Sequence, residues 1–267
     1  MKIGIAGIGA VGSSVARALD RGEIDGCALA AISARSSERA AEFNSGLTAS
    51  VPNLSLEEMA RECDMVLEAL PPPMFDQVAL PVLRAGKTLI VMSASQLLTR
   101  NDLVELARSS GARIVIPSGA MLGLDALKAV AVGNIHEVKI VTRKPPQSLR
   151  TASYIVRNAV NLDNLREAVC ILQGTVSEVA REFPANVNVA AAVSLAGLGP
   201  ERTKMEIWAD PDLQFNTHTV SVQSDSSNFS MSIQNRPSEE NAATGRITPQ
   251  SVIALLRQLN AVLRIGT

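Results

Sequence analysis

The sequence predicts an α/β protein with two domains, a doubly wound parallel sheet followed by an α+β unit with a mainly antiparallel sheet. A glycine-rich turn joins a strand to a helix at the start of the chain, and strands and helices then alternate through residue 117. Three successive strand patterns follow between residues 205 and 235. We therefore expect a first domain of residues 1–117, joined by a C-terminal helix 249–267, and a second domain of residues 118–248.

Composition limits the classes of function. The chain has 267 residues, enough for an ample core, and carries 25 basic and 26 acidic residues. This balance, with only 3% aromatic residues, predicts neither nucleic-acid nor anionic-membrane binding. The three cysteines have no metal-ligand spacing, so we expect no metal site and a reducing compartment. With no signal-peptide pattern or membrane-spanning run, a cytoplasmic protein is predicted.

The first element is a short buried strand over Lys2–Ala6, followed by the pattern G-x-G-x-x-G and a helical pattern through Leu19. In a dinucleotide site, Gly7 permits the tight turn and Gly9 lets the backbone approach a pyrophosphate, while Gly12 allows close helix packing. The alternative is a merely structural glycine turn. The order of strand, glycines and helix favours a Rossmann site for NAD or NADP, formed by Gly7, Ile8, Gly9, Ala10, Val11 and Gly12.

The second strand, Ala28–Ala34, is expected to end near the adenosine ribose. An acidic residue that would bind the 2′-hydroxyl of NAD is absent there, and Ser33-Ala34-Arg35-Ser36 stands in its place. Arg35 could pair with the 2′-phosphate of NADP or could be a solvated residue at the start of the next helix. Both interpretations stay open at this point.

The remaining elements of the first domain follow in alternation. A capping box at Ser55–Glu58 opens a short helix, and Pro71-Pro72-Pro73 ends the third strand, beside the expected nicotinamide half. The predicted strands are Asp64–Leu70, Thr88–Ser93 and Arg113–Pro117, and the predicted helices are Phe75–Ala85 and Asn101–Ser109.

The second domain is predicted from residue 118 onward. Its expected helices are Met121–Val132, Leu165–Gln173, Val176–Arg181 and Val187–Leu198. Its expected strands are Glu137–Thr142, Met205–Ala209, Asn216–Gln223 and Asn228–Asn235, with a hairpin loop at Ser224–Ser227. An amphipathic helix over Ser251–Ile265 closes the chain, with an apolar face of Val252, Leu255, Leu256, Leu259, Val262 and Leu263.

Few residues of the second domain are candidates for chemistry. His218 lies on a predicted strand face with Asn216, Val220 and Val222, where it is either a core histidine or a catalyst. Asn186 is a candidate helix N-cap, and Asn188 in the first turn could reach a ligand. Lys128 follows Asp125 on a helix and is typical of a solvated lysine. The sequence contains no G-x-S-x-G, P-loop or H-E-x-x-H motif.

Several motifs together resemble the L-aspartate dehydrogenase family. They are G-I-G-A-V-G at residues 7–12, SGAMLGLDAL at 118–127, TRKP at 142–145, EFPANVNVAA at 182–191, Asn216-x-His218 and Asn235-x-Pro-Ser238. The resemblance implies an NAD(P)-binding first domain, and a second domain with the substrate pocket and the interface of a homodimer. It also implies that His218 is the active-site residue and that Ala120 and Asn188 contact the cofactor.

The resemblance further implies oxidation of L-aspartate to iminoaspartate, which hydrolyses to oxaloacetate and ammonia or passes to a quinolinate-forming enzyme of NAD biosynthesis. Asn188 and Asn216 are expected to bind substrate, and Arg143 or Lys144 to supply positive charge if their strand faces the cleft. Two alternatives remain: a related dehydrogenase or imine reductase for another small amino or keto acid, and a non-catalytic NAD(P) sensor.

Overall fold

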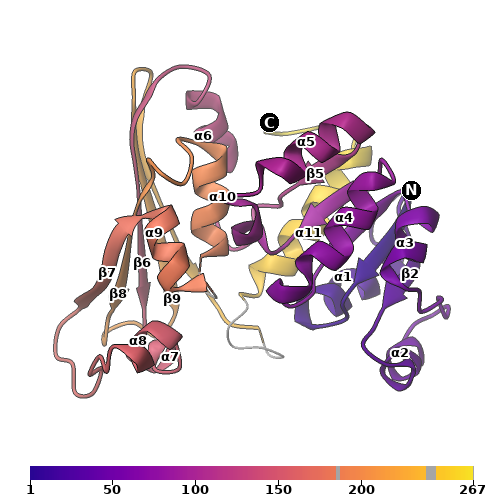
Figure 1. Cartoon of the computed structure of the whole chain (residues 1–267), viewed down its shortest axis with the longest axis horizontal. Helices are drawn as coiled ribbons and strands as arrows, with labels where there is room; N and C mark the ends of the chain where they lie inside the picture. Colours follow the sequence, from indigo (N-terminus) through magenta and orange to yellow (C-terminus); the bar gives the residue numbers. More distant parts are fainter. Residues whose placement is uncertain (185–186, 239–244, 267) are drawn as a thin grey trace. The chain divides into compact units, whose positions relative to one another are not determined.

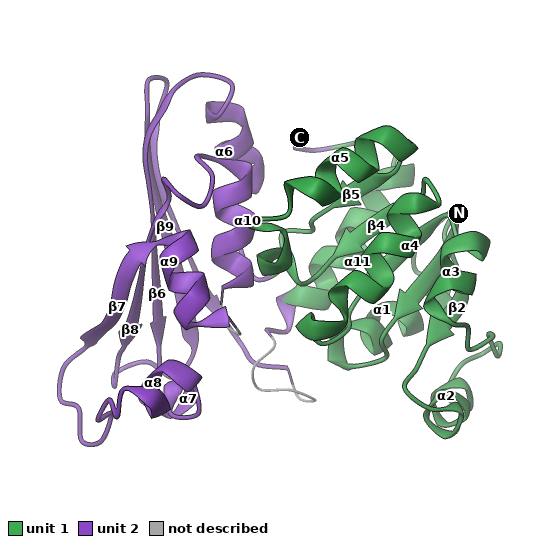
Figure 2. Cartoon of the chain, viewed as in Figure 1, with its two compact units in different colours: residues 1–119, 248–264 green, residues 120–247, 265–267 purple. Residues whose placement is uncertain are grey.

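The computed structural model describes residues 1–184, 187–238 and 245–266, so the predicted cap Asn186 lies outside the described residues. Two compact units divide the chain (Figure 2). Unit 1 comprises Met1–Gly119 and Thr248–Arg264, and unit 2 comprises Ala120–Ile247 and Ile265–Thr267.

Unit 1 contains a five-stranded parallel sheet in the order β2-β1-β3-β4-β5. Its strands are β1 (Lys2–Ala6), β2 (Ala28–Ser33), β3 (Met65–Glu68), β4 (Thr88–Val91) and β5 (Arg113–Val115). The strand order reverses at β1, because the chain adds β2 on one side of it and β3 on the other. This confirms the predicted Rossmann-type sheet, in which ligands bind at the carboxyl ends of the strands beside such a reversal.

Helices cover both faces of this sheet (Figure 1), and their bounds are α1 (Ala10–Asp20), α2 (Ser37–Asn44), α3 (Leu56–Glu62), α4 (Phe75–Arg84), α5 (Asn101–Ser110) and α11 (Ile247–Asn260). Short 3₁₀ turns, η1 (Pro72–Met74) and η2 (Ala94–Leu97), follow β3 and β4. One core cluster contains Phe75 of α4 and Leu103 of α5, and the other contains Val15 of α1 and Val252 of α11. The predicted capping box of α3 is confirmed, since Ser55 and Glu58 each accept from the other's backbone N–H.

The prediction for the C-terminal helix was wrong at both ends. Helix α11 begins at Ile247 and ends at Asn260. Val252 and Leu256 are fully buried, whereas Val262 and Leu263 lie beyond the helix and are exposed. The apolar pattern of the sequence therefore extends beyond Asn260, where the helix and its buried face end.

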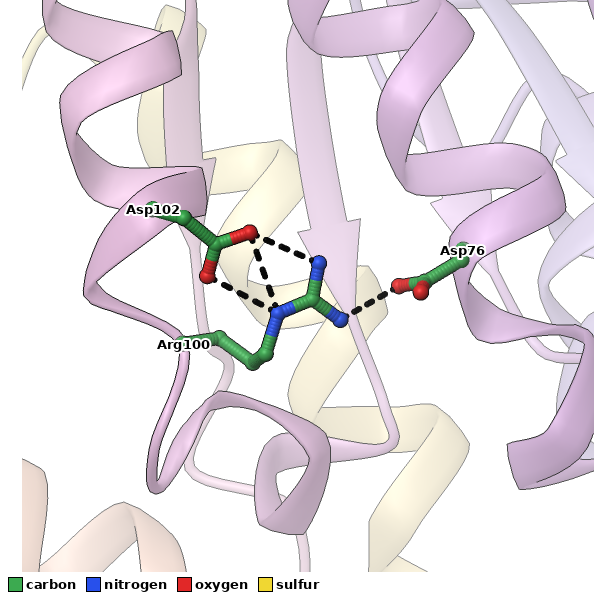
Figure 3. Close-up of polar contacts among 3 residues, drawn as sticks. All are labelled: Asp76, Arg100 and Asp102. Carbon is green, nitrogen blue, oxygen red and sulfur yellow. Dashed lines mark hydrogen bonds and ion pairs between the residues drawn. The ribbon is translucent and has the colours of Figure 1, made fainter.

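An arginine links the start of α4 to the start of α5 (Figure 3). Arg100 Nη1 donates to Asp76 Oδ1 at 2.6 Å, and Arg100 Nε donates to Asp102 Oδ1 at 2.9 Å. The two carboxylates raise the pKa of this guanidinium above its usual range. Both aspartates lie in first helical turns, where the helix dipole favours negative charge. The network fixes two helices that begin at the carboxyl edge of the sheet.

Unit 2 contains a second five-stranded sheet in the order β10-β9-β6-β8-β7. Its strands are β6 (Ile135–Lys144), β7 (Val169–Thr175), β8 (Lys204–Ala209), β9 (Asn216–Ser224) and β10 (Asn228–Asn235). Only β6 and β8 pair in parallel, and the other neighbouring strands pair antiparallel. This confirms the predicted mainly antiparallel sheet.

The helices of unit 2 include α6, α9 and α10, which lie on one side of the sheet (Figure 1). The bounds are α6 (Leu124–Val130), α7 (Pro146–Leu149), α8 (Ser153–Arg157), α9 (Val176–Glu182) and α10 (Asn188–Ala196). The predicted helix at 165–173 was wrong, because Val169–Thr175 forms β7 and pairs with β8. Helix α6 is shorter than predicted because Gly123 has φ +69°, so the helix starts after it.

Among the described residues, no helix is long and apolar enough to cross a membrane. Cys27, Cys63 and Cys170 are free thiols, and Cys63 is buried.

Candidate active site

Two glycines of the turn after β1 make contacts that a side chain would obstruct. Gly7 has φ +99°, and a Cβ there would lie 2.5 Å from the carbonyl oxygen of Ala69. A Cβ on Gly12 would lie 1.9 Å from the carbonyl oxygen of Gly7. Gly7 thus permits the tight turn, and Gly12 permits close packing of α1 against that turn.

Gly9 lies beside open space instead, since nothing is within 4 Å of a Cβ built on it. Gly9 is also the N-cap of α1, where no side chain caps the helix and no acidic residue occupies the first turn. Open space beside uncapped helix N–H groups suits a pyrophosphate. The turn of Gly7, Ile8, Gly9, Ala10, Val11 and Gly12 therefore fits the phosphates of NAD or NADP.

Arg35 follows the end of β2 and is exposed. The next residue, Ser36, caps α2 by accepting a hydrogen bond from the backbone N–H of Arg39 at 3.3 Å. The structure thus places Arg35 at the strand end where the adenosine ribose is expected.

Strand register gathers polar residues on the buried face of the sheet in unit 2. Thr142 of β6 pairs with His218 of β9, and both are buried. Asn216 of β9 pairs with Asn235 of β10. Lys144 lies two residues after Thr142 on β6, so its side chain leaves the same face. We call these five residues the polar cluster.

His218 is only 6% exposed, and its Nδ1 lies 3.0 Å from Thr142 Oγ1. Burial, and then the positive charge of Lys144, lower the pKa of His218 from 6.5 to about 4. The imidazole is therefore neutral near pH 7, and one of its ring nitrogens can accept a proton. Thr142 fixes the ring's orientation through Nδ1.

Lys144 is 7% exposed, and burial lowers the pKa of its ammonium group from 10.5 to about 8. Most Lys144 side chains are still protonated at pH 7. A protonated lysine on the face that carries His218 can form a charge-assisted hydrogen bond with an anionic ligand. The polar cluster can therefore bind a carboxylate next to a neutral proton acceptor.

Asn235 is a site candidate that the sequence identified only as part of a motif. Its side-chain Nδ2 donates to the carbonyl of Ala120 at 3.0 Å, and its Oδ1 is buried with no hydrogen-bond partner. A buried acceptor of this kind calls for a donor, such as an N–H group of a ligand. The signal in the sequence is an asparagine at an inward position after Met231 and Ile233 on β10.

Two other predicted residues are not brought into the polar cluster. Arg143 points to the opposite face of the sheet, where its Nη1 donates to Asp210 at 3.1 Å and its guanidinium lies 5.0 Å from the Trp208 ring centre. Strand alternation is the reason, since Arg143 stands between inward-facing Thr142 and Lys144. Asn188 is the first residue of α10 and is exposed. Of the two residues expected to supply positive charge, Lys144 is therefore the one on the face of the polar cluster.

The fold and the glycine turn of unit 1, together with the polar cluster of unit 2, define a two-domain NAD(P)-dependent oxidoreductase. A family model described as "Homoserine dehydrogenase, NAD binding domain" matches residues 7–117, and one described as "Aspartate dehydrogenase, C-terminal" matches residues 125–259. The chain belongs to the aspartate dehydrogenase family.

Relatives and a solved structure agree with this assignment over the whole chain. The L-aspartate dehydrogenase of Bradyrhizobium diazoefficiens is 45% identical over 100% of this chain and 94% of its own length. L-aspartate dehydrogenase 3 of Bordetella bronchiseptica is 45% identical over 99% of this chain and 97% of its own. The crystal structure of the Thermotoga maritima aspartate dehydrogenase superposes with a TM-score of 0.78 at 26% identity, covering 100% of this chain and 99% of that one.

Proposed function

We propose that this protein catalyses the reversible NAD(P)-dependent oxidation of L-aspartate to iminoaspartate, which hydrolyses to oxaloacetate and ammonia. The observation that carries the proposal is the pairing of buried Lys144 with a neutral His218 on one sheet face, in a chain of this family. The substrate offers two carboxylates and an amine that must lose a proton before the carbon–nitrogen double bond forms. The polar cluster supplies the Lys144 cation for a substrate carboxylate and the His218 imidazole as the acceptor of the amine proton.

Each residue of the polar cluster has a separate role in this proposal. Lys144 binds a substrate carboxylate, and the charge pairing offsets the cost of burying its ammonium group. His218 accepts the proton that leaves the substrate ammonium, and Thr142 holds the ring in the accepting tautomer. Asn216 and Asn235 add amide groups that orient the substrate.

Residues Gly7–Gly12 hold the pyrophosphate of the cofactor at the N-terminus of α1. When bound, NAD⁺ or NADP⁺ supplies a hydride acceptor for the α-carbon of the substrate. Ala120 and Asn188 are proposed as further cofactor contacts on the family resemblance, and Ala120 already joins the polar cluster through Asn235.

The proposed activity is tested by following absorbance of the reduced cofactor. The purified protein should reduce NAD⁺ or NADP⁺ with L-aspartate and oxidise the reduced cofactor with oxaloacetate plus ammonia. Homoserine and other small amino and keto acids serve as comparison substrates. Turnover of another acid without L-aspartate would favour the related dehydrogenase, and cofactor binding without any turnover would favour a sensor.

Cofactor choice depends in our proposal on Arg35. If its guanidinium pairs with a 2′-phosphate, Arg35→Ala should raise KM for NADPH about 10–100-fold, because a charge-assisted hydrogen bond is lost. KM for NADH should stay within about twofold, since NADH has no 2′-phosphate to lose contact with. Steady-state kinetics with NADH and NADPH would show whether Arg35 contacts the 2′-phosphate. The neighbouring Arg39→Ala serves as the matched control. Equal effects of Arg35→Ala on both cofactors would identify Arg35 as a solvated residue.

We further propose a cytoplasmic homodimer. Helices α6, α9 and α10 lie on one side of the sheet of unit 2 (Figure 1). The half-buried Trp208 and Val141 alternate with the buried Ile207 and Thr142 along their strands, so they lie on the face opposite the buried one. A second copy of the chain packed on that side would cover these residues, and sedimentation should then give twice the mass of one chain. The three free thiols suit a reducing compartment.

A further inference from the structure

Glu68, the last residue of β3, is a fully buried carboxyl group in unit 1. The mechanism proposed above does not use it. A buried carboxyl is rare unless its oxygens are satisfied, so the donors around it indicate what it does.

Four hydrogen bonds converge on this carboxyl group. Oε1 accepts from the backbone N–H of Leu70 at 3.2 Å and from the hydroxyl of Ser93 at 3.0 Å. Oε2 accepts from the backbone N–H groups of Met92 at 3.1 Å and Ser93 at 2.9 Å. Burial raises the pKa of Glu68, while the donors from Ser93, Met92 and Leu70 oppose that shift by favouring the carboxylate.

These donors belong to two different loops at the carboxyl edge of the sheet. Leu70 lies in the loop after β3, and Met92 and Ser93 begin the loop after β4. Glu68 therefore joins these two loops through its side chain. The glycine turn contacts the first of these loops, since Gly7 packs directly against the carbonyl of Ala69.

The strand order relates these loops to the two halves of a dinucleotide. The turn after β1 fits the pyrophosphate, and the end of β2 lies on the adenosine side of it. The ends of β3 and β4 lie on the other side of the reversal, where the nicotinamide half is accommodated. The backbone that Glu68 fixes thus belongs to the nicotinamide side.

We infer that Glu68 is a positioning residue for the nicotinamide half of the cofactor, acting through the backbone of residues 69–70 and 92–93. It touches neither pyrophosphate nor adenosine, which the glycine turn and β2 accommodate. The inference rests on NAD(P) binding by unit 1 and is independent of whether L-aspartate is the substrate.

The test compares two ligands that share all but the nicotinamide half. Calorimetry would measure Kd for the preferred dinucleotide and for the same molecule without its nicotinamide. That second ligand is ADP-ribose if NAD⁺ is preferred, and ADP-ribose 2′-phosphate if NADP⁺ is preferred. Glu68→Gln keeps the shape of the side chain but cannot accept from all four donors. It should weaken dinucleotide binding about tenfold or more and leave ADP-ribose binding within about twofold.

Two further variants make the comparison decisive. Ser93→Ala removes one hydrogen bond without disturbing the backbone and should weaken dinucleotide binding about threefold, again without an effect on ADP-ribose. Gly9→Ala has room for its Cβ, so it should melt like the wild type but weaken both ligands together. If Glu68→Gln fails to fold, Ser93→Ala decides the outcome. A wild-type ratio of the two Kd values in folded Glu68→Gln and Ser93→Ala would overturn the inference, whereas Gly9→Ala is expected to keep that ratio.

Discussion

Replacing His218 with alanine should lower kcat for L-aspartate by roughly 10²–10⁴-fold, the usual contribution of general acid–base catalysis. The expected loss follows from a neutral imidazole, with its pKa near 4, that accepts the proton leaving the substrate amine. Cofactor affinity should change little, because His218 is not among the residues proposed to contact the cofactor. The measurements are kcat, the Kd for NAD(P)⁺ and Tm on one preparation.

A matched control for His218 is Thr142→Val, which keeps the imidazole but removes its partner at Nδ1. Losing the orientation of the ring should lower kcat by about tenfold, less than losing the ring itself. A His218→Ala variant that melts early yet turns over L-aspartate normally per folded molecule would identify His218 as a core histidine.

Lys144→Met should raise KM for L-aspartate about 10–100-fold, because a charge-assisted contact with a carboxylate is lost. The same change should stabilise the ligand-free protein. With its pKa lowered from 10.5 to about 8, the buried ammonium costs roughly 3 kcal/mol at pH 7, and methionine fills the volume without a charge. Steady-state kinetics should show a higher KM for L-aspartate in Lys144→Met, and a melting curve should show a higher Tm for the ligand-free variant.

The pH dependence of the wild type tests the same assignment. The free enzyme holds the Lys144 charge below its pKa of about 8 and loses it above, so kcat/KM for L-aspartate should fall as pH rises past 8. The Lys144→Met variant should lack this fall. Between pH 8 and 10.5 the unfolded chain binds the proton more tightly, so this residue's contribution to the unfolding free energy rises with pH.

Arg143→Met is the matched control for Lys144, since it removes a neighbouring cation from the opposite face of the same strand. Its effect on KM should be within about threefold, because Arg143 pairs with Asp210 on the face opposite the polar cluster and does not reach the substrate in this proposal. Equal effects of the two substitutions would contradict the assignment of Lys144 to the substrate.

The sequence allowed the parallel sheet and glycine turn to be predicted because their signals are local. The order of strand, Gly7, Gly9, Gly12 and helix can be recognised from neighbouring residues alone. The apolar run at 169–172 fits a helix or a strand equally well, and only pairing with β8 makes it β7. Local pattern could not decide between them.

The candidate site was predicted less completely, because its residues meet through strand register. That Thr142 stands opposite His218 depends on the pairing of β6 with β9, across 76 positions of the chain. Glu68 lies at the end of an apolar strand, where the sequence pattern does not distinguish a buried glutamate from an exposed one. Three of its four hydrogen bonds come from Met92 and Ser93 in the loop after β4, and no spacing within the sequence reveals that pairing.

The return of α11 to unit 1 sets an order on biosynthesis. Val252 and Leu256 belong to the core cluster that contains Ile5 of β1 and Val15 of α1, so this cluster is complete only after α11 has been synthesised. A chain that stops before residue 247 would lack Val252 and Leu256 in this cluster and should be more susceptible to proteolysis than the chain that includes α11.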